Sequence, residues 1–197
     1  MRRGVFFLVA GPAGVGKTTL LKRLLAEEKG VIKAVSVTTR KPRPGEVEGV
    51  AYYFWDTERF TNAVERNEFL EHAVVHEHHY GTPKGFIEER LSRGVDVIKD
   101  IDVQGFAQIR QMEQYRYPRS VGIFVMPPSP EALIERLKGR GSEEANSLEV
   151  RIRNAEAEMA RVREYDYQVV NDDLDRGLFE LKAIRLAEHC RIRNSQS

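Results

Sequence analysis

Residues 5–18 read VFFLVAGPAGVGKT, and this stretch decides the fold. Val5 to Ala10 are apolar without a break and run directly into glycines, which is typical of a buried parallel strand covered on both faces. A helix is predicted to begin near Lys17, because leucines recur with helical spacing between Leu20 and Leu25, and Gly30 is expected to end it. The opening segment therefore predicts a strand, a glycine-rich turn and a helix.

Strand and helix patterns alternate along the rest of the chain. Strands are expected at residues 34–39, 52–55, 70–76, 95–102, 121–126 and 167–171. Helices are expected at residues 83–93, 104–114, 130–138, 148–163 and 174–187. This alternation predicts an α/β fold with a mostly parallel, doubly wound sheet.

Two stretches interrupt the alternation. Residues 40–55 contain Pro42 and Pro44, which exclude a regular helix, and the short strands that follow are expected to form a small side sheet. Residues 139–144 read GRGSEE and are typical of a polar connection.

Composition excludes several classes of protein. The chain has 197 residues, which favours one compact unit with inserted lobes over two independent domains. A formal net charge of +1 gives no general attraction to nucleic acid or to a membrane surface. No apolar run approaches the ~18 residues of a membrane span. From the charge and the short apolar runs we expect no nucleic-acid or membrane partner. The single cysteine, Cys190, cannot form an internal disulfide, so we expect a cytoplasmic protein.

The glycine-rich turn carries a phosphate-binding motif. Its residues are Gly11, Pro12, Ala13, Gly14, Val15, Gly16, Lys17 and Thr18, which match G-x-x-x-x-G-K-[ST] after a strand and at the start of a helix. Inward-pointing backbone N–H groups and the positive end of the helix form a cradle for phosphates. Lys17 is expected to reach the β- and γ-phosphates and Thr18 to bind Mg²⁺. A purely structural turn needs neither residue, so the motif predicts binding of a nucleoside triphosphate.

A basic cluster suggests where a second phosphate binds. Arg40, Lys41 and Arg43 lie on the proline-stiffened stretch, with Tyr52 and Tyr53 a short distance beyond. Guanidinium groups hold phosphate through paired N–H bonds, and a tyrosine hydroxyl adds a further contact. Such a cluster alone is more often a solvated loop. Together with a nucleotide cradle, it predicts a clamp for an acceptor phosphate.

Five blocks of sequence resemble guanylate kinase, in the order of that family and over roughly residues 5–190. The blocks are residues 11–18, 36–46, 80–83, 101–105 and 170–173. The resemblance implies transfer of the γ-phosphate of ATP to GMP, which gives ADP and GDP. It also implies the three-layer fold of P-loop nucleoside-monophosphate kinases, with a parallel central sheet, a small mixed GMP-binding lobe and a helical lid. The core is then expected at about 1–33, 83–138 and 164–197, the lobe at about 34–82 and the lid at about 139–163.

The resemblance assigns roles by position. The expected ligands of the GMP phosphate are Arg40, Arg43, Tyr52 and Tyr80. The expected guanine-binding residues are Ser36, Glu71, Thr82 and Asp102. Arg136, Arg140 and Arg151 match arginines that close on the transferring phosphate, and with Lys17 and Arg40 they form the expected catalytic set. Asn171 matches a residue that lies at the adenine of ATP.

The chemistry of guanine supports this assignment independently. Guanine offers an acceptor at O6 and donors at N1 and N2. Carboxylates at Glu71 and Asp102 can accept from the donors, while hydroxyls at Ser36 and Thr82 donate. Adenine presents the reverse pattern, and a site left with unpaired buried polar groups can discriminate by roughly 10⁴- to 10⁵-fold.

Two carboxylates are expected to share one face of the strand at residues 95–102. Asp100 and Asp102 are two apart, and alternate residues of a strand point to the same side. Asp102 is assigned to guanine, and Asp100 is proposed to support Mg²⁺ or its water shell.

The chain departs from the family pattern at several positions. Ala13 replaces a usual serine, and His72, His78 and His79 lie where the family has other residues. With His76, these histidines raise a metal hypothesis, but the spacing does not fit H-E-x-x-H and lobe packing is the better interpretation. Lys99 stands where the family is usually apolar, so we expect it to lie opposite the two aspartates and to reach solvent or find a partner.

Two alternative functions remain at this stage. A related P-loop kinase could act on a phosphorylated sugar or another nucleoside monophosphate, although it would have no use for the guanine set. A guanylate-kinase-like binding module without activity would typically have lost Lys17 or Thr18. The sequence does not predict the oligomeric state.

Overall fold

The computed structural model describes residues 3–75, 77–113, 120–138 and 145–192. The chain forms two compact units. The first comprises Met1–Phe6 and Gly30–Ser120, and the second comprises Phe7–Lys29 and Val121–Ser197. These boundaries differ from the core, lobe and lid divisions given above, which stay a prediction.

The second unit is built on three parallel strands. β1 (Phe6–Ala10) pairs with β8 (Val121–Met126), and β8 pairs with β9 (Tyr167–Val170). Every residue of β1 is buried, as the apolar run predicts. α1 (Lys17–Glu27) follows β1 after the glycine-rich turn, so the predicted order of strand, turn and helix is confirmed. α1 packs against α7 (Leu174–Cys190).

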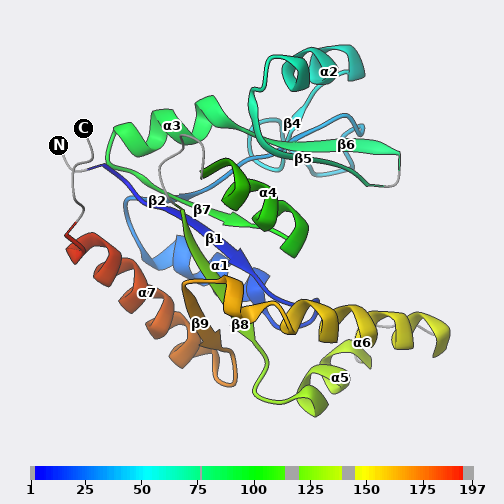
Figure 1. Ribbon diagram of the computed structural model, residues 1–197, viewed down its shortest axis with the longest axis vertical. Coiled ribbons are helices and arrows are strands. Elements are labelled where there is room, and N and C mark those ends of the chain that lie inside the picture. The colour runs from blue at the N-terminus through cyan, green and yellow to red at the C-terminus, as the bar shows by residue number, and fades with distance from the viewer. Residues whose placement is uncertain (1–2, 76, 114–119, 139–144, 193–197) are drawn as a thin grey trace. The chain divides into compact units, whose positions relative to one another are not determined.

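A helical hairpin belongs to the same unit. α5 (Pro130–Lys138) and α6 (Ala145–Met159) pack through Leu133, Leu137 and Ala155, and the short 3₁₀ helix η1 (Val162–Glu164) follows (Figure 1). The predicted helix at 148–163 is therefore placed too late, and its last turn is 3₁₀ instead of α.

The first unit contains the other edge of the parallel sheet. β2 (Val31–Lys33) pairs in parallel with β7 (Asp96–Asp100). Val5 lies beside β7, since its N–H donates to Asp96 Oδ1 at 2.8 Å and its carbonyl accepts from Val97 N–H at 3.0 Å. The order of the five-stranded sheet is β2-β7-β1-β8-β9. The predicted α/β fold with a parallel central sheet is thereby confirmed.

A small mixed sheet completes the first unit. Its strand order is β4 (Tyr53–Phe54), β3 (Val37–Thr38), β6 (His78–Pro83) and β5 (Phe69–Val75). β3 pairs in parallel with β4, and the other pairs are antiparallel. α2 (Thr57–Glu65) packs Phe60 on this sheet, where the ring stacks on Phe69 with centroids 4.6 Å apart. The predicted side sheet exists.

Two further helices extend from these strands. α3 (Lys84–Ser92) starts directly after Pro83, and α4 (Val103–Glu113) starts after Asp102. β7 ends at Asp100, and Asp102 Oδ1 accepts the N–H of Gly105 in the first turn of α4 at 2.7 Å. The expectation that Asp100 and Asp102 share one strand face is therefore wrong, because the strand ends before Asp102.

No helix within the described ranges is long and apolar enough to cross a membrane.

Two candidate nucleotide sites

The glycine-rich loop of the second unit has the backbone that its sequence requires. Gly11, Gly14 and Gly16 have φ angles of 143°, 84° and 96°, which side chains rarely tolerate. A Cβ at Gly11 would lie 2.3 Å from the carbonyl oxygen of Val125. The close approach of the loop to β8 therefore excludes a side chain at this position.

Lys17 and Thr18 lie at the start of α1. The Lys17 ammonium donates to the carbonyl oxygen of Gly11 and lies 3.5 Å from that of Pro12. Its charge is thus held within the loop. The Thr18 side chain is exposed one residue further along the helix.

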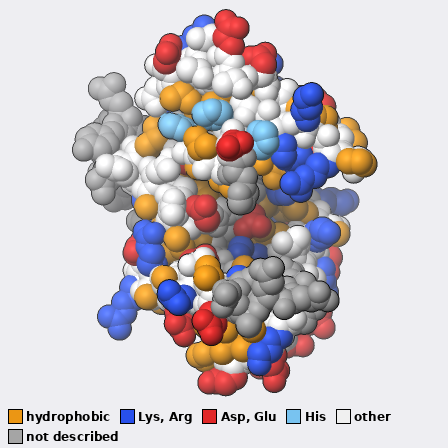
Figure 2. Space-filling model, turned by 90° about the vertical axis from the view of Figure 1, so that its right-hand side faces the viewer, with side chains coloured by type: hydrophobic (Ala, Val, Ile, Leu, Met, Phe, Trp, Pro, Cys, Tyr) orange, Lys and Arg blue, Asp and Glu red, His pale blue; other side chains and the backbone are white. Residues whose placement is uncertain are grey.

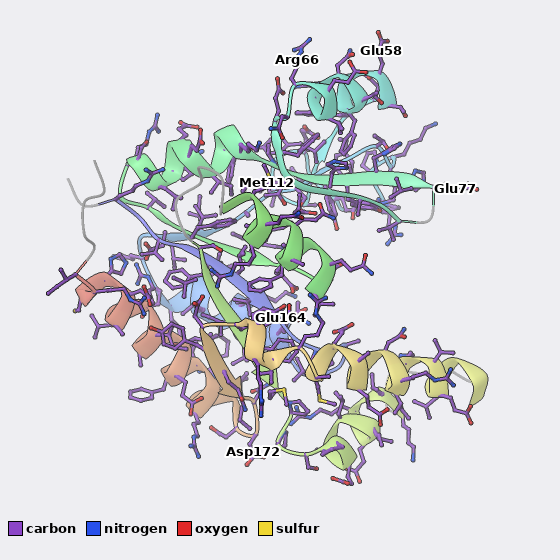
Figure 3. All side chains as sticks on the ribbon, viewed as in Figure 1. Glu58, Arg66, Glu77, Met112, Glu164 and Asp172 are labelled. Carbon is purple, nitrogen blue, oxygen red and sulfur yellow. The ribbon has the colours of Figure 1, made fainter. Side chains whose placement is uncertain are left out.

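Asn171, which directly follows β9, braces the loop. Its Nδ2 donates to the carbonyl oxygen of Val15 at 2.7 Å, and a Cβ at Gly16 would lie only 2.3 Å from this atom. The side chain is buried, and Asp172 marks the turn that follows it in Figure 3. The amide is thus engaged with the loop backbone, a role that the sequence did not reveal, and its position at the adenine stays a prediction.

The predicted lid arginines have different surroundings. Arg136 of α5 donates to the carbonyl oxygen of Asn171 through both terminal nitrogens, at 3.2 and 3.1 Å. It is fixed beside the loop, as an arginine that meets phosphates requires. Arg151 of α6 is half-buried and bonds the carbonyl oxygen of Leu137 at 3.4 Å. Arg140 falls outside the described residues.

The predicted clamp for the acceptor phosphate is largely assembled in the first unit. Arg40 forms a two-pronged ion pair with Glu46, at 2.8 and 2.9 Å, and the guanidinium lies over the ring of Tyr52 at 5.4 Å. Tyr52 and Tyr80 are in edge-to-face contact with centroids 5.9 Å apart. Three of the four predicted phosphate ligands are therefore gathered, while the Arg43 side chain is exposed.

Glu46 controls the charge of this clamp, and sequence reasoning gave it no role. Its carboxylate also accepts the backbone N–H of Arg43 at 2.7 Å. The bonds from Arg40 and then from Arg43 lower the pKa of Glu46 to about 2, and the same pair raises the pKa of Arg40. The only signal in the sequence was the short distance along the chain from Glu46 to the two arginines, which are six and three residues before it.

A pocket of about 460 Å³ lies in the same unit. Of the predicted GMP-binding residues, its lining contains Ser36, Tyr52, Glu71, Tyr80 and Asp102. The pocket joins the predicted guanine set to the tyrosines of the clamp.

Glu71 and Ser36, which line this pocket, already have hydrogen-bond partners, one of which, Thr82, is not part of the lining. The Thr82 hydroxyl is buried and donates to Glu71 Oε1. Ser36 Oγ accepts a hydrogen bond from Lys99 Nζ at 2.6 Å. Thr82 thus donates to Glu71, whereas Ser36 accepts from Lys99 and keeps its own hydrogen, and donation from these two hydroxyls to guanine stays a prediction.

Lys99 is the main departure from the expected pocket. Its side chain lines the same pocket as Asp100 and Asp102, so the expectation that it lies opposite them is wrong. The residue is 8% exposed, and Nζ lies 3.6 Å from Glu71 Oε1. Burial lowers the pKa of Lys99, and the nearby charges of Glu71 and Asp100 oppose that shift.

The histidines belong to the mixed sheet. Figure 2 shows histidine side chains gathered on one face of the molecule, and His72, His78 and His79 lie on β5 and β6. The His79 ring packs on Phe60 with centroids 5.1 Å apart. His76 lies outside the described residues, and in the part of the chain that is described no three His, Cys, Asp or Glu residues are close enough to hold a metal ion.

Comparison with known proteins identifies the family. The family model described as guanylate kinase matches residues 3–188. The chain belongs to the guanylate kinase family. A guanylate kinase of Caldanaerobacter subterraneus subsp. tengcongensis is 41% identical over 191 residues, which cover 97% of this chain and 91% of that relative. One of Symbiobacterium thermophilum is 45% identical over 98% of this chain and 90% of its own length.

A solved structure agrees with these sequence matches. The crystal structure of guanylate kinase from Anaplasma phagocytophilum superposes with a TM-score of 0.72 at 33% identity, over 96% of this chain and 88% of that one. The resemblance, the nucleoside-monophosphate-kinase fold and the enzyme class predicted from the sequence are therefore confirmed.

The two residues predicted to hold Mg²⁺ have side-chain oxygens of the kind that this ion prefers. Mg²⁺ prefers hard oxygen ligands and keeps several waters, so one or two protein oxygens suffice. The exposed hydroxyl of Thr18 and the exposed carboxylate of Asp100 have this chemistry, each in its own unit.

Proposed function

We propose that this guanylate kinase transfers the γ-phosphate of ATP to GMP through the residues assigned above, with Mg²⁺ on the phosphates. ATP is bound by the loop Gly11–Thr18, and GMP by the pocket of the first unit. The observation that carries the assignment is the clamp of Arg40, Tyr52 and Tyr80, which shares its tyrosines with the pocket lined by Ser36 and Glu71.

The reaction requires little proton chemistry. An oxygen of the GMP phosphate attacks the γ-phosphorus, and the bond from this phosphorus to the bridging oxygen of ATP breaks, so that ADP leaves with the electron pair. Catalysis therefore depends on positioning and on neutralising charge. Mg²⁺, bound by Thr18 and supported by Asp100, would neutralise charge on the phosphates.

Each cation has a separate task in this mechanism. Lys17 moves its ammonium from the carbonyl of Gly11 to the β- and γ-phosphates. Arg136, Arg140 and Arg151 stabilise charge on the transferring group. Arg40 and Arg43 hold the phosphate of GMP, and the Arg40 guanidinium is already oriented by Glu46. Asn171 braces the loop and lies at the adenine.

A coupled assay that compares GMP, AMP, UMP and ribose phosphates tests this proposal. We expect preferential turnover of GMP, loss of activity on chelation of Mg²⁺, and a fall of about 10²- to 10³-fold in kcat for Lys17→Ala, because a donor to the transition state is removed. Turnover of a sugar phosphate in preference to GMP would support the related kinase instead.

Calorimetry separates the binding module from the enzyme. A module without activity would bind GMP and show no turnover with ATP and Mg²⁺. We further propose a cytoplasmic location, supported by the exposed free thiol of Cys190, and no nucleic-acid or membrane partner, supported by the net charge of +1.

A further inference from the structure

Lys99 brings a buried positive charge to the pocket proposed for guanine. Three side chains converge there from separate segments: Ser36 before β3, Glu71 on β5 and Lys99 on β7. Lys99 Nζ is 2.6 Å from Ser36 Oγ and 3.6 Å from Glu71 Oε1. The charge therefore lies between a hydroxyl and a carboxylate, inside the pocket lining.

The bond from Lys99 determines what the Ser36 hydroxyl can do. An ammonium has only donors, while a hydroxyl has one donor and two acceptor lone pairs. Because Ser36 Oγ accepts from Lys99, its own hydrogen points away from Lys99 and is available to another acceptor. Without the ammonium, the same hydroxyl could rotate freely. Lys99 thus leaves Ser36, which lines the pocket, with its hydrogen free for an acceptor other than Lys99.

Glu71 is held by a complementary pattern. Its Oε1 accepts from the Thr82 hydroxyl and lies near the Lys99 ammonium. The pocket therefore presents an oriented hydroxyl donor at Ser36 and a carboxylate acceptor at Glu71. The 6-oxo group of guanine needs a donor, and the N1 and N2 hydrogens need an acceptor.

We infer that Lys99 is a specificity-positioning residue that fixes the Ser36 hydroxyl as a donor to the 6-oxo group of the purine. In a 6-amino purine, the amino group is a donor and would face the Ser36 hydroxyl, which is also a donor. This inference rests on the proposed function, because it assigns a role within the GMP pocket. It does not require Lys99 to touch the substrate.

Three nucleotides and one variant test the inference. GMP is compared with the monophosphate of 2,6-diaminopurine riboside, which replaces the 6-oxo group by an amino group and lacks the N1 proton. IMP keeps the 6-oxo group and N1 proton and lacks only the 2-amino group. In Lys99→Met we expect the KM and Kd of GMP and IMP to rise by the same factor, about tenfold, since one oriented hydrogen bond is lost. The diaminopurine nucleotide should change little, and kcat for GMP should be nearly unaffected.

A double-mutant cycle shows whether Lys99 acts through Ser36. Ser36→Ala should reduce the preference for GMP over the diaminopurine nucleotide by the same factor as Lys99→Met. The double variant should be no worse than either single one. A merely structural lysine would give additive losses, and would weaken all three nucleotides alike.

Lys33→Met is the matched control. Lys33 lines the same pocket on β2 and is exposed, so its removal deletes the same charge without touching Ser36. We expect any effect of this variant to be equal for the three nucleotides. A selective loss for GMP and IMP in Lys33→Met would show that general charge is responsible and would overturn the inference.

The outcomes distinguish this inference from the proposed function. If the wild-type chain neither binds nor phosphorylates GMP, the proposed function fails. If it uses GMP and Lys99→Met retains the full preference over the diaminopurine nucleotide, only the inference fails. Should Lys99→Met not fold by circular dichroism, Ser36→Ala decides alone, since an unchanged preference in that variant also overturns the inference.

Discussion

The loop proposed to bind a triphosphate and the pocket proposed to bind GMP are built on opposite principles. The loop is formed by backbone, with Gly11, Gly14 and Gly16 in conformations that exclude side chains. The pocket is lined by side chains that already have hydrogen-bond partners, such as Glu71, which accepts from Thr82, and Ser36, which accepts from Lys99. A backbone site tolerates changes of exposed side chains such as Ala13. A side-chain site is sensitive to every member of its network, because each group orients the next.

The largest expected effect comes from a side chain added to the loop. Gly16→Val places a branched residue at a φ of 96°, with its Cβ 2.3 Å from Asn171 Nδ2. We expect loss of measurable ATP binding in calorimetry and a decrease of about 2–4 kcal/mol in the free energy of unfolding.

Gly45 provides the matched control for this prediction. Its φ is 84°, but a Cβ there would meet nothing within 4 Å. Gly45→Val should therefore show backbone strain without the clash, and should retain ATP binding. Equal loss of ATP affinity in both variants would show that the clash with Asn171 is not the cause of the loss in Gly16→Val.

A smaller effect is expected where the side-chain site is weakened at one carboxylate. Glu46→Gln removes the charge that orients Arg40, so the KM of GMP should rise by about tenfold while the affinity for ATP stays unchanged. Steady-state kinetics with each substrate varied provides the measurement. Glu58→Gln, at an exposed position on α2 (Figure 3), is the control and should leave both constants as they are. An equal rise in the KM of ATP would contradict the separation of the two sites.

The acid titration of Glu46 sharpens the same point. Its pKa in the folded chain is lowered to about 2 from the ordinary value of 4.5, so the ion pair favours the folded state at every pH above 4.5. That contribution is lost as the pH falls from 4.5 through about 2. The difference in unfolding free energy between wild type and Glu46→Gln should therefore shrink over this range. A difference that stays constant from pH 6 to pH 2.5, measured by urea denaturation, would rule out the ion pair as its cause.

The smallest expected effect concerns the stability cost of Lys99. Burial lowers the pKa of this residue below its ordinary value of 10.5, so the charged form is disfavoured in the folded chain. This penalty is fully present below the pKa of Lys99 in the folded chain and disappears as the pH rises through that pKa toward 10.5, because over this range the unfolded chain holds more protons. Glu71 and Asp100 near the ammonium reduce the penalty, and Lys33 adds to it.

Lys99→Met removes this penalty but leaves the largely buried carboxylate of Glu71 without its ammonium partner, so the two effects oppose each other in the free energy of unfolding at pH 7. Raising the pH to 10 should increase the stability of the wild type relative to the variant. Urea denaturation of both proteins at pH 7 and pH 10 provides the measurement. A fall in the unfolding free energy of the wild type relative to the variant at pH 10 would show that the charge of Lys99 stabilises the folded chain.

The loop could be predicted from the sequence because its determinants are local. Glycines at positions of positive φ, a preceding apolar strand and the Lys17-Thr18 pair all lie within one short segment. β1 and α1, which flank the loop, were equally predictable, and α5 and β8 have the predicted bounds, whereas β2 directly after α1 was not predicted.

The elements that sequence reasoning missed are held by tertiary contacts. β6 contains Gly81 and Pro83, which rarely favour a strand, and it exists because β3 and β5 pair with it on both sides. α2 is short and mostly polar, and its Phe60 finds Phe69 only in the folded unit. For the same reason, the partners of Lys99 could not be read from its own strand.

The brace formed by Asn171 bears on how the chain matures during synthesis. The loop residues are synthesised before the side chain that fastens Val15, because Asn171 lies 156 residues further along the chain. Domains generally fold as units during translation. A nascent chain that stops short of Asn171 therefore carries the whole phosphate-binding motif without the hydrogen bond that fastens Val15.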